Sequence, residues 1–271
     1  MTDISFAPAK LPVIATFEKT CRAFLKALGP LALLILLAIG VFFAGFVAMA
    51  IPLGGLAFAL QRGLGLDPGS LPFGLAMAPL SLLFIGVFIA LALRFAIAQY
   101  KVAESAAEGR NLKFMDILRD PKPSLVSYFL LTLVVGIFTL LGMILFIVPG
   151  IMIALALCMA PMAMIFEGKD VGGALQRSRD LTRDNRWRLL GLFILSGLVF
   201  FPAFLLTSPP LESDPDVALS PLAGVFFLLN LLVSFASSIF TVVLAVTIYR
   251  ELRALKDDQG EAATPEPSGA D

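Results

Sequence analysis

Histidine is absent from the 271 residues of this chain, and cysteine occurs only twice. Without histidine the protein lacks the side chain that most often carries protons near neutral pH and most often binds metals. Cys21 and Cys158 lie far apart in the sequence and match no metal-binding or redox spacing, so we expect two reduced thiols. The sequence therefore predicts no metal centre and no cofactor.

Charge is also scarce, because charged residues make up 15% of the chain and hydrophobic residues 59%. A soluble domain usually carries about 25% charged residues, which it needs to cover a surface that faces water. The mean hydropathy is +0.94, and the formal net charge is zero, which gives no reason to expect a nucleic-acid partner. These values predict an all-α polytopic membrane protein.

Six apolar segments are long enough to cross a bilayer, which takes about 20 residues of helix. They cover residues 30–51, 73–99, 125–148, 150–166, 189–207 and 222–249. The third and fourth segments are separated only by Val148-Pro149-Gly150, a sequence that favours a turn. We therefore expect an N-terminal segment with an amphipathic helix over 1–29, a six-helix membrane domain over 30–253 and a disordered acidic tail over 254–271.

Lysine and arginine are distributed unevenly between the two ends of these spans. Residues 1–29, 100–124, 167–188 and 250–271 hold 18 of the 20 basic residues, while the loops on the opposite side hold only Arg62. Cytoplasmic loops carry such an excess, so we expect both termini and the even-numbered loops to be cytoplasmic.

A repeated pattern precedes the third and fifth spans. The sequence "EGRNLKFMDILRD" begins at Glu108 and "EGKDVGGALQRSRD" begins at Glu167. In both, a glycine can end one helix and an Asn111 or Asp170 can cap the next. Together with apolar residues at helical spacing near the start of the chain, the pattern predicts three short cytoplasmic elbow helices, each followed by a two-helix hairpin.

The elbow after Glu167 has one apolar or small face and one charged face. The first face is formed by Val171, Ala174, Leu175, Ser178 and Leu181. The charged face and the residues that follow carry five arginines, which are Arg177, Arg179, Arg183, Arg186 and Arg188. An interfacial helix of this kind attracts anionic lipids. Two interpretations remain open for the arginines: a solvated bend between spans, or a contact for lipid headgroups or a protein partner.

Two further features are polar within the spans. Arg94 lies inside the second span, where a charge is costly, and it either extends to the interface or forms an internal ion pair or anion site. The sixth span carries a polar face, formed by Asn230, Ser234, Ser237, Ser238 and Thr241. Such a face serves helix packing or lines a polar path.

The chain resembles a known family from residue 149 onward. The matching residues are Pro149-Gly150, Ala174-Leu175, Arg177-Ser178, Leu181-Thr182, Trp187-Arg188-Leu189-Leu190-Gly191 and the closing "YRELR" from Tyr249 to Arg253. They resemble the membrane domain associated with bacterial glycerophosphoryl diester phosphodiesterases, and related multi-pass bacterial families. This resemblance implies a location in the bacterial cytoplasmic membrane. It does not imply the phosphodiesterase activity, because a chain without histidine cannot supply the usual catalytic pair of that activity.

The pattern as a whole favours a non-enzymatic function, since no nucleophile–base pair, paired carboxylates or phosphate-binding glycine loop is present. We expect the protein to bind membrane lipids or to act as a scaffold for another membrane or envelope protein that processes phospholipids. The alternative is a transporter of a lipid or small molecule, with a groove near Arg94 and the polar face of the sixth span. An intramembrane enzyme is the third possibility.

Overall fold

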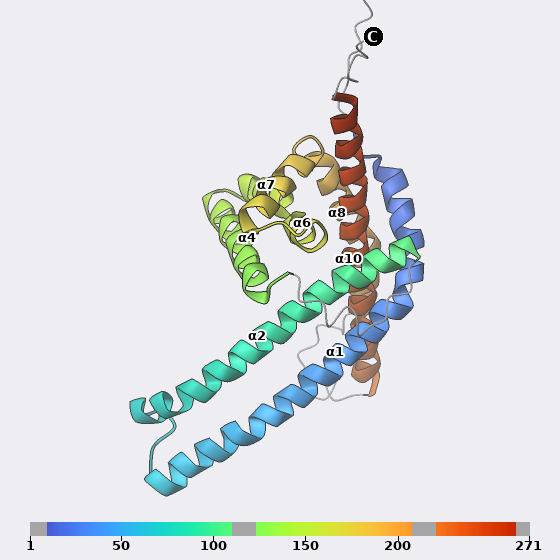
Figure 1. The fold of residues 1–271 in the computed structure, drawn as a ribbon. Helices are drawn as coiled ribbons and strands as arrows, with labels where there is room; N and C mark the ends of the chain where they lie inside the picture. Colours follow the sequence, from blue (N-terminus) through green and yellow to red (C-terminus); the bar gives the residue numbers. More distant parts are fainter. Residues whose placement is uncertain (1–9, 110–122, 208–220, 264–271) are drawn as a thin grey trace, which may run out of the picture. The chain divides into compact units, whose positions relative to one another are not determined.

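The computed structural model describes residues 10–109, 123–207 and 221–263, with the side chains of the last segment described over 224–257. Every regular element in these ranges is a helix (Figure 1). The helices are α1 (Val13–Leu64), α2 (Leu71–Glu108), α4 (Leu125–Leu145), α5 (Ile147–Leu157), α6 (Ala160–Glu167), α7 (Val171–Thr182), α8 (Arg186–Thr207) and α10 (Pro221–Ala263).

Six of the described helical segments are long and apolar enough to cross a membrane. Five of them lie in α1, α2, α4, α8 and α10, and the sixth combines α5 and α6 over Ile147–Glu167. The predicted all-α, multi-pass membrane protein is thereby confirmed.

Residues 32–99 form one compact unit, a hairpin of the later part of α1 and the earlier part of α2. Gly65 adopts a left-handed conformation with φ of 62°, and the Leu66 N–H donates to the Leu60 carbonyl at 3.1 Å. This pattern is typical of a glycine-terminated helix, because glycine adopts positive φ without steric cost. The two helices contact through aromatic pairs, with the Phe42 and Phe88 ring centroids 5.5 Å apart.

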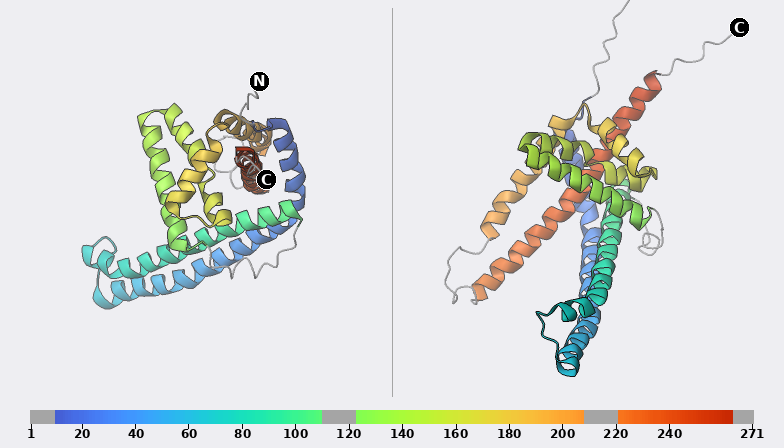
Figure 2. Two further views of the ribbon diagram at one scale, coloured as in Figure 1. Left: turned by 45° about the horizontal axis from the view of Figure 1, so that its top comes forward. Right: turned by 90° about the vertical axis from the view of Figure 1, so that its left-hand side faces the viewer.

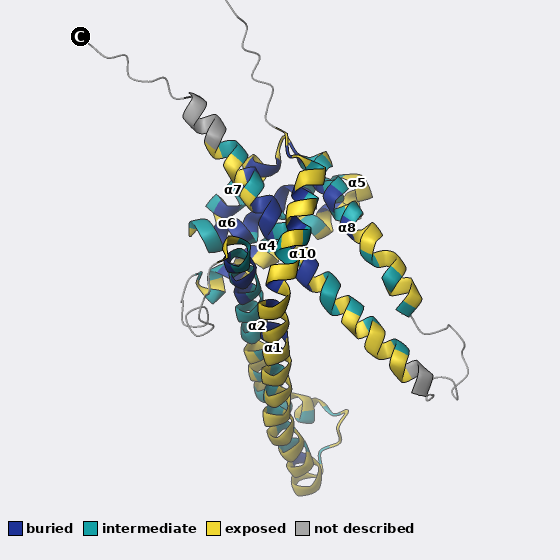
Figure 3. Ribbon diagram, turned by 90° about the vertical axis from the view of Figure 1, so that its right-hand side faces the viewer, coloured by how far each residue is buried: buried dark blue, intermediate teal, exposed yellow. Residues whose placement is uncertain are grey.

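Residues 10–31, 100–109, 123–207 and 221–263 belong to a second unit, whose interior lies where α5, α6, α7 and the later part of α10 meet. Figure 3 shows the buried residues of this unit concentrated in these helices. Phe240 of α10 contacts Phe17 and Phe24 of α1 on one side and Phe200 of α8 on the other. Accordingly, the first part of α1 and α8 lie on either side of α10 when it is seen end-on (Figure 2, left). Close packing of aromatic rings contributes to stability beyond the area that they bury.

The turn between the third and fourth spans lies earlier than we predicted. The helical conformation breaks at Phe146, which is extended with φ of −160° and ψ of 146°, and not at Val148-Pro149-Gly150. Pro149 falls in the first turn of α5, where its missing N–H has no helical partner in any case. Gly150 permits close approach of the two helices, since a Cβ at this position would lie 2.6 Å from the backbone nitrogen of Met143.

The ends of the membrane domain also differ from the prediction. The expected N-terminal elbow is not a separate helix, because α1 runs without interruption from Val13 through Gly29 and Pro30 into the first span. The second expected elbow, with Asn111, lies outside the described residues. At the other end α10 continues past Arg253 to Ala263, so residues 254–263 are helical where we expected disorder. An Arg253–Asp257 ion pair at 3.4 Å, spaced i,i+4, favours this extension.

Candidate functional site

The third elbow forms a separate helix, α7, as predicted, and local signals define its start. Gly168 ends α6 in the left-handed conformation with φ of 65°. Asp170 then caps α7, because its carboxylate accepts a hydrogen bond from the Gly173 N–H at 3.2 Å. Of the predicted apolar or small face, Ala174, Ser178 and Leu181 are fully buried. The face assignment is confirmed for these three residues.

Ser178 attaches α7 to the junction between α5 and α6. Its Oγ donates to the Ala156 carbonyl at 2.7 Å and accepts from the Met159 N–H at 3.2 Å. Both backbone groups lie beside the interruption that ends α5 at Leu157, where helical hydrogen bonds are lost. A hydroxyl can donate one hydrogen bond and accept another, so Ser178 bonds both a backbone carbonyl and a backbone N–H beside the interruption.

The turn between α7 and α8 holds the N-terminal segment. The Asn185 side-chain oxygen accepts a hydrogen bond from the Leu11 N–H at 2.9 Å, and Arg188 Nη1 donates to the Leu11 carbonyl at 2.6 Å. Leu11 itself is fully buried. Leu11 is therefore held against the α7–α8 turn although it lies far from this turn in the sequence. One guanidinium nitrogen of Arg188 is engaged in this contact.

Arg177 has two carboxylate partners within the protein. Its Nε lies 3.1 Å from each oxygen of Glu167, and its Nη2 lies 3.3 Å from Asp257. Glu167 also accepts a hydrogen bond from the Tyr249 hydroxyl and lies 3.6 Å from Lys169. Partial burial lowers the pKa of Arg177, but the bonds to Glu167 and Asp257 outweigh this effect and raise it. The charge of Arg177 is thus compensated by α6 and α10.

Arg179 and Arg186 lie at the edge of an apolar groove between α4, α5, α7 and α8. The groove has a volume of about 540 Å³, and its apolar wall includes Phe138, Val148, Pro149, Met152 and Ile153. Neither arginine forms an ion pair with a described residue. The Arg186 Nε is buried and has no hydrogen-bond acceptor among the described residues. An unpaired buried donor is costly, so this position favours an anionic ligand.

A second depression of about 330 Å³, here called the arginine pocket, adjoins the apolar groove. Met152 and Arg186 line both. The other cations of the arginine pocket are Lys10, Arg183 and Arg188, and its one carboxylate, Asp184, lies 2.8 Å from Lys256. Trp187 also lines it and is 70% exposed. The combined surface places an apolar channel next to a cluster of cations.

The structure distributes the predicted site residues over several environments. Arg179, Arg183, Arg186 and Arg188 line the two adjoining grooves, whereas Arg177 is held in the ion-pair cluster. Arg94 is half-buried in α2 and belongs to the unit of residues 32–99. Its two predicted roles, extension to the interface and an internal ion pair or anion site, both stay predictions.

The polar face of α10 forms a hydrogen bond to a neighbouring helix at one of its five positions. The Asn230 amide donates to the Thr207 hydroxyl of α8 at 3.5 Å, and the Thr241 hydroxyl donates to the Ser237 carbonyl at 2.8 Å. Ser234 and Ser238 are exposed. The Asn230 bond agrees with the packing interpretation, whereas the Thr241 bond lies within α10 and supports neither interpretation.

Sequence reasoning did not identify Lys10 or the apolar wall of the groove. Phe138, Val148 and Met152 are ordinary apolar residues of spans, and no local pattern distinguishes them from residues that face lipid. Only the packing of α4 and α5 against α7 and α8 brings them next to Arg179 and Arg186.

Among the residues that the structure describes, no group of histidine, cysteine, aspartate or glutamate residues could hold a metal ion. Comparison of the chain with protein-family models, curated proteins and solved structures finds no match. The resemblance to the phosphodiesterase-associated membrane domain accordingly stays a prediction.

Proposed function

We propose that this protein is a non-enzymatic, multi-pass protein of the bacterial cytoplasmic membrane that binds an anionic phospholipid. The observation that carries the proposal is the apolar groove that ends at two arginines without ion pairs and adjoins the arginine pocket. A phospholipid has the same two parts, an apolar chain and a charged headgroup.

The apolar part of the ligand fits the walls of α4 and α5. The volume of the apolar groove, about 540 Å³, lies within the range of roughly 300–1,000 Å³ that is usual for ligand sites. Because α4 and α5 belong to membrane spans, an acyl chain can enter the groove from the bilayer without passing through water.

The headgroup would contact Arg186 from the shared edge and Lys10, Arg183 and Arg188 from the arginine pocket. Arginine suits this role because its planar guanidinium donates two parallel hydrogen bonds to a phosphate. The excess of lysine and arginine in residues 167–188 supports placing this surface on the cytoplasmic side, where anionic lipids add to the attraction. Trp187 then lies at the level of the interface, as exposed tryptophan does in membrane proteins.

Native mass spectrometry of the gently solubilised protein, loaded with phosphatidylglycerol, tests the proposal. Each arginine near a membrane surface contributes about 1 kcal/mol of attraction, so the double variant Arg179→Gln/Arg186→Gln loses about 2 kcal/mol, or roughly thirtyfold in lipid affinity. Arg253→Gln is the matched control, because Arg253 lies outside both grooves and pairs with Asp257.

Equal lipid retention in all three proteins would reject the proposal. A wild-type protein that retains another polypeptide and no lipid would instead support the scaffold interpretation. The transporter interpretation rests on Arg94 and the polar face of α10, which belong to different units, and it stays a prediction.

A further inference from the structure

A third depression, here called the α1–α10 groove, lies apart from the surfaces described above and has a different chemistry. Its volume is about 260 Å³, and four cations line it: Lys19, Arg22 and Lys26 of α1, and Arg250 of α10. The remaining walls are small or polar and consist of Ala23, Ala107, Thr247 and Glu251. A groove without large apolar side chains cannot hold an acyl chain, but it can hold a small hydrated anion.

The carboxylates near the α1–α10 groove leave part of its positive charge uncompensated. Glu251 pairs with Lys19 at 2.7 Å, and Glu18 pairs with Arg22. A further carboxylate, Glu108, is 4.0 Å from Arg250, at the outer limit of an ion pair. Lys26 forms no ion pair or hydrogen bond with a described residue.

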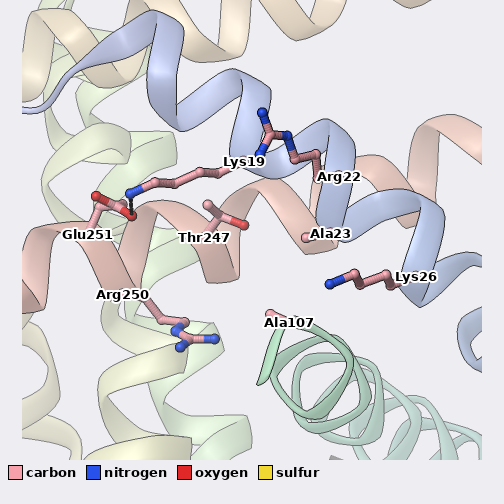
Figure 4. Close-up of a pocket in the computed structure, with 8 residues that line it drawn as sticks. All are labelled: Lys19, Arg22, Ala23, Lys26, Ala107, Thr247, Arg250 and Glu251. Atoms are coloured by element: carbon pink, nitrogen blue, oxygen red, sulfur yellow. Dashed lines mark hydrogen bonds and ion pairs between the residues drawn. The ribbon is translucent and has the colours of Figure 1, made fainter. Parts of the chain in front are cut away.

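Lys26 and Arg250 approach the same space from different helices. Figure 4 shows the Lys26 ammonium and the Arg250 guanidinium extending toward each other from either side of Ala107, while the Lys19 ammonium is turned to Glu251. Because Ala23 and Ala107 have short side chains, they leave this space open. At about 30 Å³ per water molecule the groove holds roughly nine waters, which is enough for a phosphate group.

We propose that the α1–α10 groove binds a phosphate-bearing anion between Lys26 and Arg250. The guanidinium of Arg250 supplies paired donors and the ammonium of Lys26 supplies a compact charge, and both are common phosphate ligands in proteins. Glu251 limits the affinity, because it neutralises Lys19 at the edge of the site. The phosphate belongs either to a free small molecule or to a lipid headgroup. The proposal does not depend on the lipid site at Arg179 and Arg186.

The test measures how fast the Lys26 amine is acylated by a water-soluble ester, read by mass spectrometry on the full chain in nanodiscs. One arm adds inorganic phosphate to nanodiscs of pure phosphatidylcholine, at ionic strength matched with chloride. The other arm replaces part of the phosphatidylcholine with phosphatidic acid and adds no free phosphate. Protection of Lys26 in the first arm identifies a soluble ligand, and protection in the second arm alone identifies a headgroup.

Three variants make the assignment specific. Arg250→Gln should weaken protection about fivefold, the upper range for one partly exposed charge pair. Glu251→Gln should strengthen protection by a similar factor, since it releases the Lys19 charge. Arg253→Gln, one helical turn away on the solvent-exposed side, should change nothing. Lys26 left unprotected in both arms, or protection that Arg250→Gln does not alter, would overturn the proposal.

Discussion

The ion-pair cluster around Glu167 allows a quantitative test of how burial affects the contribution of a charged contact to the free energy of unfolding. Glu167 accepts hydrogen bonds from Arg177 Nε and from the Tyr249 hydroxyl, and its side chain is only 12% exposed. Asp257 contacts the same arginine at 3.3 Å, but its side chain is 56% exposed. The two carboxylates therefore differ in environment while they share a partner.

Glu167→Gln should cost about 2–3 kcal/mol of the free energy of unfolding. Hydrogen bonds to charged groups contribute about 1.5–3 kcal/mol each, and the glutamine keeps one oxygen that can still accept from Tyr249 or Arg177. Asp257→Asn should cost less than about 1 kcal/mol, because exposed ion pairs contribute roughly 0–1 kcal/mol. Tyr249→Phe should fall between them, since it removes one bond to the carboxylate and leaves the ring contact with Phe166.

The assay is thermal unfolding in detergent in a Cys21→Ser background. Unfolding is monitored by the reaction of Cys158 with a thiol-reactive dye. Cys158 is a free thiol next to the α5–α6 junction, beneath the elbow that Glu167 and Arg177 hold. The variants Glu167→Gln and Tyr249→Phe should be less than additive when combined, because they share one hydrogen bond. The reasoning is refuted if Asp257→Asn destabilises as much as Glu167→Gln, or if Glu167→Gln changes stability by less than about 0.5 kcal/mol.

Two further substitutions test packing and the attachment of the N-terminal segment. Gly150→Ala should destabilise the protein by about 1–3 kcal/mol, because its Cβ would meet the Met143 backbone at 2.6 Å, whereas Gly191→Ala has open space and should be neutral or slightly stabilising in the same unfolding assay. Asn185→Ala leaves the buried Leu11 N–H without its acceptor and should cost about 1–3 kcal/mol, measured as faster proteolytic cleavage near the N-terminus, and an unchanged cleavage rate would contradict the assignment.

The parts of the fold that depend on local signals were predictable. The buried face of α7 follows from apolar spacing, and its start follows from a glycine and a capping aspartate within three residues of each other. The six spans follow from their length and hydropathy. These features need only neighbouring residues, so the sequence contains all the information required to place them.

The parts that depend on distant residues were not predictable. Arg177 lies within two residues of Ser178 and Arg179, yet it is held in an ion-pair cluster by Glu167, whose carboxylate also accepts a hydrogen bond from Tyr249, 82 residues further on. The turn at Phe146 was missed because a proline near a helix start is compatible with either side of a break. The helical extension of α10 was missed because acidic, polar composition suggests disorder, whereas ion pairs to Arg177 and Asp184 hold its described end.

The attachment of Leu11 to the α7–α8 turn has a consequence for biosynthesis. Leu11 leaves the ribosome well before its hydrogen-bond partner Asn185, which follows 174 residues later. At a synthesis rate of about 5–20 residues per second, the N-terminal segment waits roughly 9–35 s before this partner exists. During that interval the apolar side chains of the N-terminal segment need another surface to contact. The nearest one is the membrane surface beside the newly inserted first span. The chain can therefore complete this part of its interior only after the fourth span has been made.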